Sequence, residues 1–297
     1  MKRNKGLRIA LCALCLGIAF VLFELWYSYD YLTVTSYAFT TGKLTEPVRA
    51  VILADMHDHE FGRDNERLIA AVQAQSPDVI LMVGDMLNRD SADETKAAAL
   101  VRALSANAPV YYAMGNHEND YAFAQRDYWR EQLSAQLTQA GATVLDRAYE
   151  DIAVRGQRLR IGGMYDYAFA LDMRNSTDPN RMNPEVYQFL TAFQDTELLT
   201  LMLAHRPDSF IFGEASATWT IDLVISGHLH GGQVVLPFLG GVWGGDQHFF
   251  PEYVYGMVEK DKLNLLITSG LGSNVQKVPR FNNPPEIVVL NLVPAED

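Results

Sequence analysis

The feature that most constrains the fold of this sequence is a series of short apolar runs that each stop at side chains able to bind metal ions. The segment "LVISGHLHGGQ" (223–233) shows the pattern, because an apolar run gives way to His228, His230 and two glycines. Earlier apolar runs end in the same way, at Asp55, His57, Asp85, Asn116, His117 and His205. Five of the seven histidines therefore follow apolar runs, and in α/β proteins the loops after strands form binding sites.

Apolar runs that alternate with helical spacing predict a layered α/β sheet with parallel character. We expect strands at 48–55, 77–85, 108–116, 158–166, 198–205, 222–228, 263–270 and 286–293. Helices are expected at 63–75, with Asp64 as N-cap, and at 91–106, where Ser91 and Glu94 have capping-box spacing. Two further helices are expected at 125–140 and 184–193.

Each polar residue after a strand has an ordinary interpretation on its own, as a cap or a turn former. Independent turns do not explain carboxylate, amide and imidazole side chains at five strand ends, so we interpret the set as a metal site. Oxygen and imidazole ligands without thiolate suit Mn, Fe or Zn. The spacing of Asp55 and His57, and of His228 and His230, predicts that each pair shares one face of an extended segment. Asp85 is a candidate to bridge two ions.

The bulk composition restricts the function classes. The 297 residues are 48% hydrophobic and carry a net charge of −12, so we expect no nucleic-acid partner. Cys12 and Cys15 are the only cysteines, so the rest of the chain has neither a disulfide nor a zinc–thiolate site. Their position in an apolar run favours small residues of a membrane helix over lipidation sites.

The N-terminal segment predicts a membrane anchor. Residues 1–8 are basic, and residues 9–26 are apolar except for Glu24. These eighteen residues span about 27 Å as a helix, close to the hydrocarbon thickness. A cleaved signal or a buried helix is the alternative, but no small-residue cleavage site is evident. We expect a basic flank (1–8), a single-pass anchor (9–26) in the cytoplasmic (inner) membrane, a tether (27–46) and a domain (47–297), with the N-terminus inside and the domain outside.

The order of the motifs resembles the calcineurin-like metallophosphoesterases. The blocks read Asp55-Met56-His57, Gly84-Asp85, Gly115-Asn116-His117-Glu118, His205 and Gly227-His228-Leu229-His230. The resemblance covers about residues 48–293, and "GHLHGGQ" and "GLGSNVQKVPRFNNPPEI" are similar to a bacterial YkuE/YaeI-like subgroup. It implies a four-layer α-β-β-α sandwich, in which two mixed sheets are flanked by helices, following the transmembrane helix.

The resemblance also implies a site with two divalent metal ions (Mn, Fe or Zn). The first ion would be held by Asp55, His57, Asp85 and His230, and the second by Asp85, Asn116, His205 and His228. His117 would contact the phosphoryl group or the leaving oxygen, as general acid or as transition-state donor, oriented by Glu118 or another carboxylate. We expect catalytic roles for His117, Asp85 and Asn116, and substrate contacts from Asn116, His117 and Arg280. For Arg280 a surface position in a proline-bounded loop is the alternative.

The expected function is that of a membrane-anchored phosphoesterase, with phosphodiesters as the first choice of substrate, cleaved by a hydroxide that bridges the two ions. One alternative is a pyrophosphatase of lipid A synthesis that resembles UDP-2,3-diacylglucosamine hydrolases, although UDP-sugars are cytoplasmic. The other alternative is a non-catalytic metal-binding scaffold, which the complete ligand set disfavours. The aromatic, glycine-rich stretch 236–253 would suit a lipid- or envelope-linked substrate; a folded core loop is the simpler interpretation.

Overall fold

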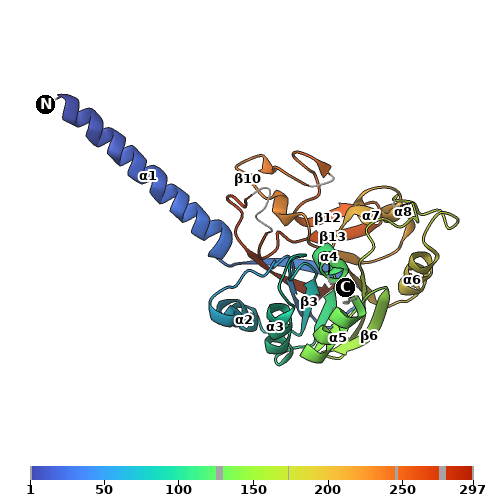
Figure 1. Ribbon diagram of the computed structural model, residues 1–297. Coiled ribbons are helices and arrows are strands. Elements are labelled where there is room, and N and C mark those ends of the chain that lie inside the picture. Colours follow the sequence, from blue (N-terminus) through green and yellow to red (C-terminus); the bar gives the residue numbers. More distant parts are fainter. Residues whose placement is uncertain (1, 125–129, 173, 245–246, 274–278, 296–297) are drawn as a thin grey trace.

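The centre of the molecule is a pair of six-stranded sheets (Figure 1). The computed structural model describes residues 2–295 apart from 125–129, 173, 245–246 and 274–278. The first sheet contains, in spatial order, β1 (Thr33–Thr41), β14 (Glu286–Pro294), β2 (Val48–Leu53), β3 (Val79–Val83), β4 (Val110–Ala113) and β5 (Ala142–Val144). From β2 to β5 the strands are parallel, whereas β14 is antiparallel to β2.

The second sheet has the same mixed character. Its spatial order is β12 (Gly256–Lys260), β13 (Leu263–Ile267), β9 (Leu223–Ser226), β8 (Leu199–Ala204), β7 (Gln157–Met164) and β6 (Ala148–Val154). The four inner strands are parallel, and the two edge strands are antiparallel to their neighbours. A separate two-stranded ribbon consists of β10 (Val235–Leu236) and β11 (Gly240–Gly241).

Three apolar clusters define the layers. Along β2, Val51 and Leu53 belong to a cluster with the helices of the first sheet, whereas Ala50 and Ile52 belong to a cluster shared by both sheets. This alternation buries both faces of the strand. The third cluster lies between the second sheet and its own helices. The outer helices are α2 (Glu66–Ala74), α3 (Thr95–Ser105) and α5 (Arg130–Ala140) on one side, and α6 (Pro184–Gln194), α7 (Asp208–Ile211) and α8 (Ala215–Thr218) on the other. The predicted four-layer sandwich is confirmed.

The N-terminal helix α1 (Lys2–Asp30) projects away from this sandwich (Figure 1). Its part from Arg8 to Asp30 is long and apolar enough to cross a membrane. The next segment differs from the tether predicted for residues 27–46. Residues 33–41 form β1, which pairs in parallel with β14 over all nine residues. Main-chain pairing at the sheet edge, rather than an apolar run, determines this strand, so the apolar pattern alone does not reveal it.

The helix starts also differ from the sequence prediction. Asp64 does not cap α2, because it has a left-handed backbone (φ 54°) inside the short helix η1 (Arg63–Asn65). Helix α3 begins at Thr95, and the Ser91 hydroxyl donates to the Asp58 carboxylate instead of capping it. Of the helix predicted at 125–140, residues 130–140 are helical as α5, while 125–129 lie outside the described residues. The helix predicted at 184–193 is confirmed as α6.

Candidate metal centre

The polar residues predicted at strand ends gather where parallel strands of both sheets terminate. They follow β2, β3 and β4 of the first sheet and β8 and β9 of the second. Three groups of these side chains have potential ligand atoms within 4.8 Å of one another: Asp55–His57–His230, His57–Asp85–His117 and Asp85–His205–His228. Residues more than 170 positions apart in the chain therefore meet in one site.

The backbone of this site is strained. Five of the side-chain donors have positive φ: Asp55 (54°), His57 (51°), Asp85 (54°), His228 (70°) and His230 (46°). Such conformations cost about 1–3 kcal/mol each and cluster at functional sites. The prediction that Asp55 and His57, and likewise His228 and His230, share a face of an extended segment is wrong, because β2 ends at Leu53 and β9 at Ser226. Left-handed turns, not strand alternation, direct these side chains.

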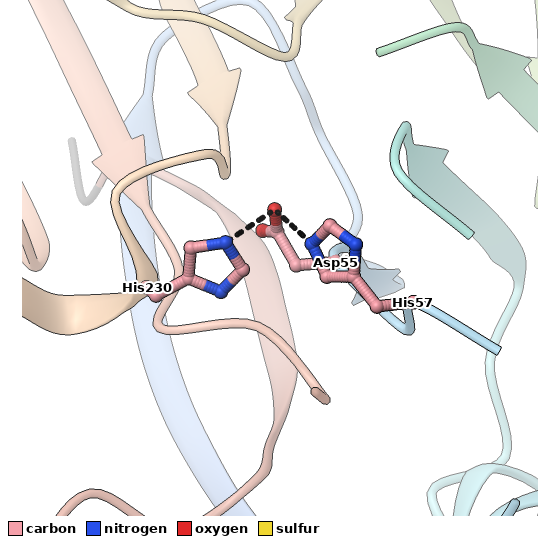
Figure 2. A group of neighbouring side chains, drawn as sticks. All are labelled: Asp55, His57 and His230. Carbon is pink, nitrogen blue, oxygen red and sulfur yellow. Dashed lines mark ion pairs between the residues drawn. The ribbon is translucent and has the colours of Figure 1, made fainter. Parts of the chain in front are cut away.

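Asp55 is the centre of the first group (Figure 2). Its Oδ1 lies 3.8 Å from Nε2 of His57 and 3.6 Å from Nε2 of His230. These distances are too long for hydrogen bonds. Two ligands at about 2.0–2.2 Å from one tetrahedral ion lie about 3.4 Å from each other. The separations therefore fit side chains that converge on a shared cation better than side chains bonded to one another.

Asp85 lies between the two groups. Its Oδ2 is 3.0 Å from Nε2 of His205 and 3.9 Å from Nε2 of His57. Its Oδ1 accepts a hydrogen bond of 2.8 Å from the amide of His117, which fixes the orientation of the carboxylate. Oδ1 of Asp55 is also 3.8 Å from Nε2 of His205. A carboxylate with imidazoles of both groups beside one oxygen has the placement needed to bridge two ions.

Three imidazoles are held with one nitrogen facing inward. Nδ1 of His205 donates to the carbonyl of Val83 (2.7 Å), and Nδ1 of His230 donates to the carbonyl of Gly272 (3.1 Å). Nδ1 of His57 pairs with Oδ1 of Asn88 (3.0 Å). Since each Nδ1 has an oxygen partner, the neutral rings of His57 and His230 direct the lone pair of the opposite nitrogen, Nε2, into the site, while Nε2 of His205 faces Oδ2 of Asp85. Such outer hydrogen bonds orient metal-binding histidines in proteins.

The protonation states also suit cations. Burial lowers the pKa of His57 to about 4 and the pKa values of His228 and His230 well below their usual range, so these rings are neutral. Burial raises the pKa of Asp55 to about 7, helped by the charge of Asp85. Burial alone would lower the pKa of His205, but the two carboxylates raise it to about 10. Without an ion, the proton on His205 balances the charge of the Asp85 carboxylate, a role that a bound cation would take over.

Comparison with known proteins agrees with this geometry. The profile of the family described as calcineurin-like phosphoesterase matches residues 48–232, which include every one of the side chains that converge here. The chain belongs to this family. The match confirms the enzyme class expected from the sequence, a metal-dependent phosphoester hydrolase, and divalent ions as its cofactors.

Several relatives of this phosphoesterase are bacterial. It is 26% identical to the uncharacterized metallophosphoesterase YkuE of Bacillus subtilis (80% of this chain, 76% of the relative) and 27% identical to the phosphodiesterase YaeI of Escherichia coli (83% of each). These two matches confirm the predicted resemblance. It is also 29% identical to the uncharacterized metallophosphoesterase Cj0846 of Campylobacter jejuni, over 84% of this chain but only 60% of that protein.

Asn116 and His117 open helix α4 (Asn116–Ala124), beside the converging ligands. Oδ1 of Asn116 is buried and has no hydrogen-bond partner among the described residues, as expected of an atom reserved for a ligand. Nδ1 of His117 accepts from the amide of Arg89 (3.2 Å), so the neutral ring carries its proton on Nε2. The ring of His117 lies 4.7 Å from that of His57, centre to centre. The phosphoesterase thus places a half-buried hydrogen-bond donor next to the ligands.

Glu118 has a different task from the one predicted, which was to orient His117. Its buried carboxylate accepts from the amides of Asp85 (2.8 Å), Met86 (2.8 Å) and Gly115 (2.9 Å), and from the hydroxyl of Tyr112 (2.5 Å). One side chain therefore ties together the loops after β3 and β4. The only sequence signal for Glu118 is its position directly after Gly-Asn-His. This position does not tell whether Glu118 orients His117 or joins the loops after β3 and β4.

The structure corrects the prediction for the environment of Arg280. It was expected to bind substrate phosphate or to lie on the surface, but its guanidinium is buried and donates to main-chain carbonyls, among them Ser269 (2.8 Å), Gly272 (2.7 Å) and Asn283 (2.9 Å). The carbonyl of Gly272 is the same atom that receives Nδ1–H of His230. Arg280 therefore positions His230 through the loop rather than touching a substrate.

Proposed function

We propose that this protein is a membrane-anchored phosphodiesterase with two divalent metal ions. The observation that carries the proposal is the convergence of two carboxylates and four imidazoles, whose potential ligand atoms form overlapping groups within 4.8 Å, beside the buried Oδ1 of Asn116, which has no hydrogen-bond partner among the described residues. Asp55, His57, Asp85 and His230 would hold one ion. The second ion would be held by Asp85, Asn116, His205 and His228. Mn, Fe and Zn suit this set of oxygen and nitrogen donors.

The residues of the chain divide the work of hydrolysis. When bound, the two ions would activate a water molecule, hold the phosphate oxygens and neutralise developing charge. Asn116 would orient the phosphoryl group from the start of α4. Nε2–H of His117 would donate to the phosphoryl or leaving oxygen, since its other nitrogen is occupied by the amide of Arg89. Glu118 would keep Asp85 in place while the charge at the site changes.

The substrate class is supported by the relatives. YaeI carries the name phosphodiesterase, and we extend this preference to the present chain. The first experiment strips metal from the full chain, restores Mn, Zn or Fe, and measures cleavage of a nitrophenyl phosphodiester and of the matching monoester. We expect metal-dependent cleavage that favours the diester and is lost in N116A and H228A, while H248A, which removes an exposed histidine outside the site, retains it. Activity that survives in N116A and H228A would refute the proposed centre.

The anchor belongs to the same proposal. Helix α1 would cross the cytoplasmic membrane once, with its basic start inside and the phosphoesterase domain on the extracytoplasmic side. An alkaline phosphatase reporter fused after Asp297 tests this orientation, because it is active only outside the cytoplasm. An inactive reporter would place the domain in the cytoplasm and favour the alternative, a lipid-linked pyrophosphate substrate.

A further inference from the structure

The loop between η2 (His230–Gly232) and β12 carries a group of exposed apolar side chains. Phe238 is fully exposed, and Leu239, Phe249 and Phe250 have exposed fractions of 64%, 67% and 56%. Trp243 stacks edge-on against Phe249, with the ring centres 5.0 Å apart. No residue from 231 to 245 carries a charge. We call Phe238, Leu239, Trp243, Phe249 and Phe250 the apolar face.

The backbone holds this face open to solvent. The ribbon of β10 and β11 is closed by further main-chain hydrogen bonds, from Val242 to Val234 (2.8 Å) and from Phe250 to Val242 (2.9 Å). Phe238 and Phe250 have φ of 68° and 55°, which is costly for aromatic residues. A strained backbone at Phe238 and Phe250 thus presents aromatic rings away from the protein core. Strain of this kind points to a function for the exposed rings.

The same loop is joined to the end of α1. Asn282 bridges the two, because its side-chain Nδ2 donates to the carbonyl of Val235 (3.0 Å) and its amide donates to the carboxylate of Glu24. One residue earlier, Phe281 lies 6.3 Å from Phe20, ring centre to ring centre. Figure 1 shows β10 on the side of the sandwich where α1 leaves it. The apolar face therefore has a defined place relative to the anchor.

When α1 crosses a bilayer, the apolar face lies at the surface of that bilayer. Phe20 and Glu24 belong to the apolar run, and Phe20 precedes its last residue, Trp26, by about 9 Å along a helix axis. The loop next to these residues thus lies at the depth of the membrane interface, where aromatic side chains are favoured. The basic residues at 1–8 precede the anchor, and the acidic domain that follows it offers no attraction to anionic lipid. Apolar burial is the interaction that this uncharged face can make with a membrane.

We propose that the apolar face is a membrane-docking surface, which inserts beside α1 and seats the phosphoesterase domain on the bilayer. The proposal rests on the anchoring proposed above. A cavity of about 430 Å³ is lined by Leu239 of the apolar face, by Tyr255 and Asn283, and by Gly231, the neighbour of His230. Docking therefore sets the distance of the metal centre from the lipid headgroups.

The test uses the full chain in liposomes, with Cys12 and Cys15 changed to serine and one cysteine introduced for an environment-sensitive dye. The test positions are F238C and F249C. The matched control is L171C, which replaces another exposed apolar side chain (71% exposed) outside the apolar face. L16C in α1 reports on the anchor. Quenching is measured with lipids that carry spin labels on their acyl chains and with aqueous iodide.

We expect lipid quenching and a blue-shifted emission at 16, 238 and 249, and iodide quenching at 171. If lipid quenches the dye at 16 while 238 and 249 behave as 171 does, the docking surface is refuted and the anchor stands. A blue shift at 238 and 249 without lipid quenching would mean that protein, such as a second copy of the chain, covers the face, which also overturns the proposal. If lipid quenches none of the four positions, anchoring and docking both fail.

Discussion

Replacing Gly227 by alanine is expected to disable the metal centre through one added methyl group. A Cβ at this position would lie 2.3 Å from Oδ2 of Asp55 and 2.9 Å from Cβ of Ala54, whereas ordinary contacts lie at 3.4–4 Å. The carboxylate must therefore move by about 1 Å. It would then lose the hydrogen bonds of 3.1 and 3.0 Å that it accepts from the amide of His228. A misplacement of about 1 Å costs on the order of a hundredfold in rate, which corresponds to about 2.7 kcal/mol.

The assay compares G227A with G42A, because a Cβ at Gly42 meets no heavy atom within 4 Å. Each protein is loaded with metal, its metal content is determined by elemental analysis, and its turnover of the nitrophenyl diester is measured. Thermal unfolding of both metal-free proteins shows whether the methyl group disturbs the fold as a whole. If G227A matched G42A in metal content and turnover, Asp55 would not be a ligand, and the placement of the centre would be refuted.

Three further outcomes follow from the same contacts. Chelation should lower the unfolding temperature by roughly 5–10 °C, since a ligand at a hundred times its dissociation constant stabilises by about 2.7 kcal/mol; an unchanged melting curve would contradict a metal-linked fold. H117N should keep two ions per chain but lose on the order of 10²–10⁴ in turnover; loss of one ion would make His117 a ligand. E24A should destabilise the protein in detergent by about 1–3 kcal/mol, because the amide of Asn282 loses its acceptor, whereas E24Q retains an oxygen there; equal unfolding of E24A and wild type would show that this contact is unimportant.

The residues of the candidate metal centre were predictable because each of them follows a buried apolar strand. Parallel strands bring their carboxyl ends to the same edge of a sheet, so these residues meet. Their geometry was not predictable by strand alternation. Asp55 and His57 lie past the end of β2 in left-handed turns, a conformation that no apolar pattern records. Glu118 and Arg280 escaped correct assignment for a related reason. Most of their partners are main-chain amides and carbonyls, which any residue type carries, so the sequence does not identify them.

The layers of the fold were predictable wherever strands are buried on both faces, as in β3 and β8, where every residue is buried. The edge strand β1 was not, since its residues alternate only between exposed and half-buried and include four threonines. Its position depends on pairing with β14. Sequence reasoning therefore finds the interior of such sheets more easily than their edges.

The pairing of β1 with β14 has a consequence for the order in which the protein is made. Thr33 pairs with Glu286, so about 250 residues must be synthesised after β1 before its partner exists. At roughly 5–20 residues per second this takes ~10–50 s. Because β14 also pairs with β2, the first sheet cannot close until residues 286–294 have been synthesised. A chain truncated before Glu286 would lack β14 and leave β1 without its partner, so incomplete chains would be open sheets with an unpaired edge.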